Sequence, residues 1–126
     1  GLGDVYKRQE LAKQQFQSVL EKTNNSMSKT ISQLYLLQIA LIEGDNKKAE
    51  EYASIRGVKS FLSIKTADMQ VIQAWYQFKV RKDVVQTHKA MKIARQKMNS
   101  SRMLRDEKSY YENLLAELEK ELTEGV

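Results

Sequence analysis

The side chains that could perform covalent or acid–base chemistry stand isolated in this sequence. His88 is the single histidine and cysteine is absent, so no second imidazole or thiolate can share a metal ion with it, and we predict a surface histidine. Ser54, Ser60 and Ser63 lack the glycine-flanked turn that exposes a nucleophilic serine, and only one histidine exists to act as their base. We therefore predict no catalytic, cofactor-binding or metal-binding residues.

Pairs of carboxylates do occur, but in segments rich in charge. Glu50 and Glu51 are adjacent, and Glu117 and Glu119 are two residues apart. Charged helix surfaces offer neither member of a pair the apolar surroundings that acid catalysis needs. The glycine-rich loop that holds phosphates in nucleotide-binding proteins is also missing from the sequence. We predict that the protein is not an enzyme.

Basic residues are concentrated between Lys79 and Arg105, where nine of them stand against one acid, Asp83. A basic helix can follow phosphates, and a net charge of +5 is compatible with binding RNA or another polyanion. We nevertheless interpret this segment as a solvated face opposite a buried stripe, with polyanion binding as the alternative. The predicted basic patch comprises Lys82, Lys89, Lys92, Arg95 and Lys97.

The elements that must position these side chains are helices. The chain of 126 residues contains no proline and only five glycines, and residues that lose little side-chain freedom in a helix are abundant. With 41% apolar and 29% charged residues, it has the composition of an ordinary globular protein and the length of one domain. Its longest apolar run, Tyr35 to Ile42, is far shorter than the roughly 20 residues of a membrane span. We predict one all-α domain over residues 10–126.

Stop and cap signals divide the chain into six predicted helices. Asn24-Asn25, Gly44-Asp45 and Asn99-Ser100 are typical helix ends or N-caps. Gly57 is expected to break a helix and to be followed by a short extra turn. The segment Tyr35 to Ile42 is apolar on nearly every side, which is typical of a helix in the middle of a core. The predicted helices lie near residues 10–22, 27–43, 46–55, 67–81, 83–98 and 101–123.

The first nine residues are expected not to belong to the natural protein. Asp4-Val5-Tyr6-Lys7-Arg8-Gln9 is the translation of GATGTGTATAAGAGACAG and resembles the transposase mosaic-end adapter of sequencing libraries. The natural reading frame is then expected to begin near Glu10, with its true amino terminus missing. A natural polar helix start is the alternative.

Three stretches of the chain repeat one pattern of large apolar residues, a turn and a small residue. Ala12, Ala49 and Thr87 are its equivalent points, 37 and 38 residues apart. The turn of the second stretch is Gly44-Asp45, and Lys82-Asp83 stands at the same point of the third. The clearest pattern runs through Tyr35-Leu36-Leu37, Ala40-Leu41, Gly44-Asp45, Lys48-Ala49 and Tyr52-Ala53.

This pattern resembles the tetratricopeptide repeat, whose period is about 34 residues, over residues 10–98. The resemblance implies antiparallel helical hairpins stacked as a short solenoid. The longer period requires extra residues between hairpins, which we expect in the segment from Arg56 to Thr66. A related helical-hairpin solenoid with longer repeats is the alternative.

The resemblance implies a groove lined by the first helix of each hairpin, in which the protein would bind a peptide or protein segment as an interaction scaffold. One alternative is the C-terminal peptide-sensing domain of a transcription regulator whose DNA-binding part is missing. A second alternative is binding of RNA or another polyanion by residues 79–105. The implied groove residues are Gln33, Leu34, Gln38, Leu41, Gln73, Tyr76 and Lys79.

The two ends of the predicted stack differ in character. Residues 101–123 carry one apolar stripe and otherwise charged faces, so we predict a C-terminal capping helix there. No such cap covers the helix at residues 10–22. Its side chains Leu11, Phe16 and Val19 are therefore expected to form an exposed apolar surface through which the chain could self-associate. We expect a cytoplasmic location unless a missing N-terminus carries a signal or an anchor.

Overall fold

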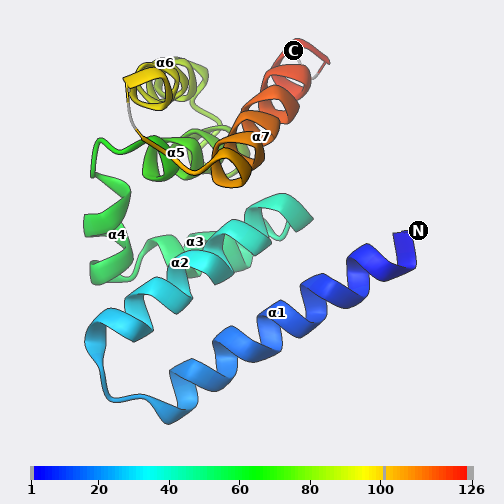
Figure 1. Cartoon of the computed structure of the whole chain (residues 1–126), viewed down its shortest axis with the longest axis vertical. Coiled ribbons are helices and arrows are strands. Elements are labelled where there is room, and N and C mark those ends of the chain that lie inside the picture. The colour runs from blue at the N-terminus through cyan, green and yellow to red at the C-terminus, as the bar shows by residue number, and fades with distance from the viewer. Residues whose placement is uncertain (1, 101, 125–126) are drawn as a thin grey trace. The chain divides into compact units, whose positions relative to one another are not determined.

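Seven α-helices make up the part of the chain that the structure describes, residues 2–100 and 102–124 of a computed structural model (Figure 1). Side chains are described from residue 7 onward. No strand occurs among the described residues, so the prediction of an all-α protein is confirmed. The helices are α1 (Leu2–Lys22), α2 (Ser26–Glu43), α3 (Asn46–Ala53), α4 (Arg56–Leu62), α5 (Ala67–Lys79), α6 (Val84–Ser100) and α7 (Arg105–Glu124).

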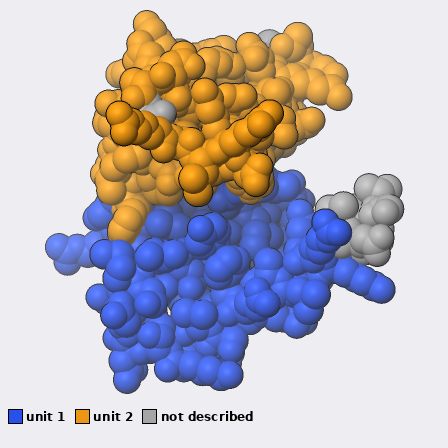
Figure 2. All heavy atoms as spheres, in the orientation of Figure 1, with its two compact units in different colours: residues 1–60 blue, residues 61–126 orange. Residues whose placement is uncertain are grey.

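The chain divides into two compact units, residues 1–60 (unit 1) and residues 61–126 (unit 2), which Figure 2 shows in separate colours. Each unit is held together mainly by its own helices. In unit 1, α2 packs against both α1 and α3, and in unit 2, α5 packs against α6 and α7. These units are defined by internal packing alone, so the single repeat domain stays a prediction.

Unit 1 is built around α2, which runs antiparallel to α1 and continues through a tight turn into α3 (Figure 1). Asn25 caps α2, because its side chain accepts a hydrogen bond from Ser28 N at 3.0 Å. The helix α1 begins at Leu2, upstream of its predicted start, and includes the adapter-like hexapeptide. The side chains of residues 2–6 lie outside the described residues. The buried apolar residues of this unit are Leu34, Leu36, Leu37, Ala40, Leu41, Ala49, Ala53 and Val58.

The segment after α3 differs from its prediction, because Gly57 lies inside a helix and does not end one. This helix, α4, runs from Arg56 to Leu62. A Cβ atom on Gly57 would lie 2.7 Å from Thr30 Oγ1 of α2. The glycine is therefore required by the close approach of two helices, a tertiary cause that local helix signals do not report.

Unit 2 consists of the antiparallel pair α5 and α6, with α7 packed against α5 (Figure 1). Trp75 is buried, and its Nε1 donates to Leu114 O at 3.1 Å. The predicted start of the last helix, Ser101, lies outside the described residues, and α7 begins at Arg105. The buried residues of α7 form one apolar stripe and are Tyr111, Leu115, Leu118 and Leu122, whereas Leu114 is half-buried.

The turn between α2 and α3 and the turn between α5 and α6 share two features, although the first has two residues and the second has four. Gly44 has a φ of 80° and Lys82 has a φ of 56°, both in the left-handed region. An aspartate follows in each turn and caps the next helix. Asp45 accepts from Lys48 N at 3.2 Å, and Asp83 accepts from Gln86 N at 3.0 Å. The two turns that the sequence pattern treats as equivalent therefore share a left-handed residue and the aspartate cap that follows it.

Candidate binding face

The predicted groove residues of unit 1 lie largely inside the structure. Leu34, Gln38 and Leu41 are buried, and Gln33 is half-buried. Because α2 contacts α1 and α3 along two of its sides, the residues available to a partner must lie on another side of the same helix. Among the unit 1 candidates, none is exposed.

In unit 2, the predicted groove residues are half-buried and two of them are engaged by neighbours. Gln73 Nε2 donates to Leu62 O at 3.1 Å, where it satisfies a carbonyl at the end of α4. Lys79 Nζ lies 2.5 Å from Glu121 Oε1 and 5.6 Å from the centre of the Trp75 ring. Tyr76 is half-buried on the same helix. The ammonium of Lys79 therefore fastens α7 to α5.

A row of large apolar side chains is exposed along one face of α2. The spacings of four, four and seven residues place its members on one side of the helix. Their exposed fractions are large for apolar side chains in a helix that also has seven buried residues. The row, which we call the α2 face, comprises Met27 (54% exposed), Ile31 (42%), Tyr35 (46%) and Ile42 (38%).

The α2 face continues onto α1 through a pair of aromatic rings. Phe16 and Tyr35 are stacked with their centres 4.8 Å apart and their planes 6° from parallel. Leu11 and Val19 of α1 are exposed, as predicted, whereas Phe16 is half-buried because Tyr35 covers it. Sequence reasoning placed the exposed apolar surface on α1 alone and missed its α2 part. The four- and seven-residue spacing of Met27, Ile31, Tyr35 and Ile42 was the signal that could have found it.

A pocket that is open to solvent lies among α1, α2 and α3 in unit 1. Lys13 Nζ stands in it, 2.7 Å from Glu43 Oε2 and 3.1 Å from Glu10 Oε1. Its hydrogen bond with Glu43 raises the pKa of Lys13 above its ordinary value. The amine is therefore held as a cation and is unsuited to act as a nucleophile.

The structure brings together two residues that were predicted for different sites. Gln73 and Lys89 both line an open hollow between α5 and α6. Gln70 also lines this hollow, and its Nε2 donates to Ile64 O at 2.9 Å. Two of the amides in the hollow thus satisfy carbonyls at and just beyond the end of α4, which gives them a role in the fold.

All five residues of the predicted basic patch are exposed, but they are not equally free. Arg95 Nη2 forms an ion pair with Glu119 Oε2 of α7 at 3.0 Å. The four lysines form no ion pair with any described residue. Lys82 extends from the turn before α6, and the other three lie on α6 itself.

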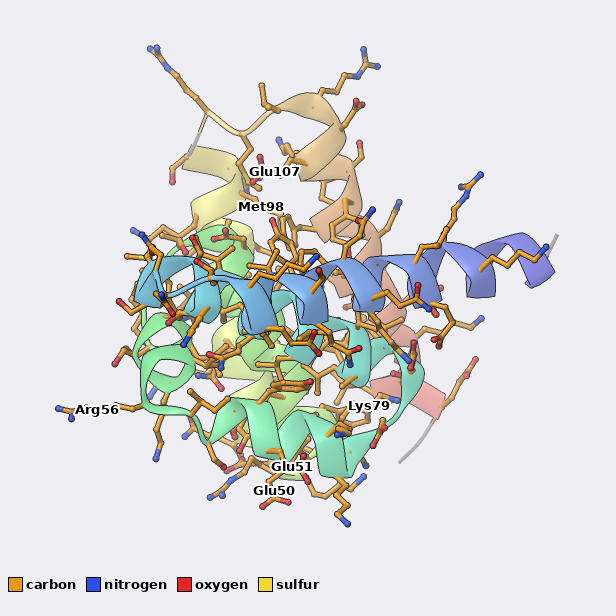
Figure 3. All side chains as sticks on the ribbon, turned by 90° about the horizontal axis from the view of Figure 1, so that it is seen from below. Glu50, Glu51, Arg56, Lys79, Met98 and Glu107 are labelled. Carbon is orange, nitrogen blue, oxygen red and sulfur yellow. The ribbon has the colours of Figure 1, made fainter. Side chains whose placement is uncertain are left out.

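The side chains that could perform acid–base chemistry, His88 and the pair Glu50 and Glu51, lie on the surface. His88 is exposed, as predicted. Glu50 and Glu51 are both exposed, and their side chains project outward from α3 (Figure 3). Over the described residues, no three histidine, aspartate or glutamate side chains gather as a metal site would require.

Neither a membrane-spanning helix nor a similar known protein was found for this chain, the former over its described residues. Within the described ranges, no helix combines the length and the apolar character that crossing a membrane would demand. A scan of the chain against protein-family models gives no match, and searches among curated proteins and solved structures give none either.

Proposed function

We propose that the protein is a helical-hairpin scaffold of the tetratricopeptide type that binds a peptide or protein segment on the α2 face. The observation that carries this proposal is the exposure of four large apolar side chains on one side of α2, a helix that also carries much of the core of unit 1. Single exposed apolar residues are normal on protein surfaces, whereas several that share one side of a helix are typical of an interaction site. Met27, Ile31 and Tyr35 follow one another at successive turns, and the buried Gln38 lies between Tyr35 and Ile42.

The size of the row suits a short partner segment. From Met27 to Ile42 the α2 face spans about 22 Å along the helix axis. Completing the burial of four half-exposed side chains would contribute on the order of 3–6 kcal/mol before the cost of ordering the partner. That contribution is enough for a moderate affinity if a few polar contacts accompany it.

The hairpin type is supported by the two equivalent turns. Gly44-Asp45 and Lys82-Asp83 lie 38 residues apart and share a left-handed residue followed by a capping aspartate. In a tetratricopeptide-like stack the first helix of each hairpin presents the binding surface, and α2 is the first helix of the α2–α3 hairpin. The α2 face is thus where such a protein would receive its partner.

The proposed contact residues differ from the groove residues that the sequence implied. Ile31, Tyr35 and Ile42 replace Leu34 and Leu41, whose side chains are buried. The change is a rotation about the axis of α2 by roughly one residue, or about 100°. Tyr35 is the expected anchor, because it offers a large, rigid ring already held in place by Phe16.

A selection from a displayed peptide library, followed by affinity measurements on the enriched peptides, tests this function. Ile31→Ser and Tyr35→Ser should each weaken binding about tenfold or more, as expected for central contacts. Val85→Ser is the matched control, because Val85 is 74% exposed on α6 in the other unit. Enriched peptides that bind all three variants as tightly as the wild type would refute the proposal.

A further inference from the structure

One side of α6 and the turn before it carry exposed side chains that are mostly cationic or amide. The members from Val85 to Asn99 recur every three or four residues, which places them on a single face of the helix over about 21 Å of its axis. Lys82 precedes the helix, and all of the members are exposed. The row, which we call the lysine row, comprises Lys82, Val85, Lys89, Lys92, Gln96 and Asn99.

The lysines of the lysine row are not paired with acids within the described part of the chain. Lys82, Lys89 and Lys92 form no ion pair with a described residue. The nearest acid in sequence, Asp83, caps α6 by accepting from Gln86 N at 3.0 Å. The sequence of α6 itself contains no acid.

The structure also separates the lysine row from the other members of the predicted basic patch. Arg95 is turned toward α7 and paired with Glu119. Lys97 lies roughly 100° around the helix from the row. Three lysines on one line therefore remain from the five residues that the sequence grouped together.

The backbone at Lys82 adds a second observation. Lysine rarely adopts a positive φ, and the equivalent turn has a glycine, Gly44, at this point. Keeping a lysine there works against the backbone preference. Lys82 lies two residues before the start of α6 and is exposed. A strained residue with a charged side chain points to a functional use of that charge.

We infer that the lysine row binds the phosphate backbone of a nucleic acid without reading its sequence. Lysine is depleted in the cores of protein interfaces but is a common partner of phosphates. An anionic membrane is less suited, because the apolar side chains Met91, Ala94 and Met98 are buried and only Val85 in the row could insert. The row contains no aromatic side chain on which bases could stack. Duplexes should therefore bind at least as well as single strands.

Fluorescence anisotropy with a labelled 20-base-pair DNA duplex, and with a single-stranded RNA of about 20 nucleotides, tests this inference across salt concentrations. With three phosphate contacts, the logarithm of the duplex affinity should fall with the logarithm of salt concentration with a slope of about −3. The double variant Lys89→Gln/Lys92→Gln should reduce the size of that slope by about 2 and weaken binding roughly tenfold at low salt.

The matched control is Lys22→Gln/Lys47→Gln, which removes the same charge from exposed positions in unit 1. It should leave the slope unchanged and the affinity within about twofold. Far-UV circular dichroism verifies that both double variants stay helical. Three results would each overturn the inference: no binding of either nucleic acid at low ionic strength, equal losses in the two double variants, or row-dependent binding to phosphatidylserine vesicles but not to nucleic acid.

Discussion

The absence of a Cβ atom at Gly57 allows α4 to approach α2 closely. Gly57 lies in the first turn of α4, and a Cβ atom on it would come within 2.7 Å of Thr30 Oγ1 and 3.3 Å of Thr30 Cγ2. Thr30 is β-branched, so it has few rotamers with which to give way. Its hydroxyl also donates to Ser26 O at 3.0 Å. The missing side chain of Gly57 thus makes room for Thr30.

Replacing this glycine should destabilise the protein. We expect Gly57→Ala to lower the free energy of unfolding by about 1–2 kcal/mol, because overpacking costs about 1–3 kcal/mol and the better helix propensity of alanine returns at most about 1 kcal/mol. Urea denaturation measures the change. In a Thr30→Ala background, which lacks both close atoms, the penalty should fall to near zero or change sign. An equal penalty in both backgrounds would show that the contact with Thr30 is not its cause.

Among the elements, the helix ends are what the sequence specifies best. Asn25 and Asp45 each accept a hydrogen bond from the backbone three residues later, and such local contacts can be recognised from neighbouring residue types alone. The helix through Gly57 could not be recognised in this way, because its cause is the distant Thr30. Local sequence signals therefore predict the ends of most helices, whereas a helix that depends on tertiary packing, such as α4, cannot be predicted from them.

The sequence does not predict which side of α2 is exposed, for a similar reason. A helix with apolar residues all round predicts burial but does not say which side stays open. That choice depends on where α1 and α3 pack. Leu34 and Leu41 were consequently assigned to the groove, whereas Ile31 and Ile42 are the exposed residues. The sequence identifies the helix that carries the candidate site, but not its rotation.

The two equivalent turns allow a matched pair of substitutions. Gly44→Ala should cost about 1 kcal/mol, because alanine is strained at a φ of 80° although nothing lies within 4 Å of the added atom. Lys82→Gly should have the opposite sign, with a gain of up to about 1 kcal/mol, since glycine relieves the strain at 56°. Thermal or urea unfolding measures both changes. Effects of the same sign would contradict the equivalence of the turns.

On the scale of the whole molecule, the α2 face belongs to unit 1 and the lysine row to unit 2. Their chemistry also differs, because one is apolar and the other is cationic. Substitutions on one surface should therefore leave binding at the other unchanged, and the two proposals can fail separately.

The expectation of one repeat domain predicts that both units unfold together. Trp75 is the only tryptophan and reports on unit 2, whereas far-UV circular dichroism reports on the helices of both units. In urea, the tryptophan fluorescence and the circular dichroism should show coincident transitions with one midpoint. Two separated midpoints would show that the units unfold independently, and the single-domain prediction would then be wrong.

The central claim is that the α2 face receives a partner segment, and methyl NMR during titration with a selected peptide tests it most directly. The account predicts that the methyl signals of Met27, Ile31 and Ile42 shift as the peptide is added, while those of Val85 and Ile93 on α6 stay in place. Shifts confined to α6, with the α2 methyl signals unmoved, would contradict it.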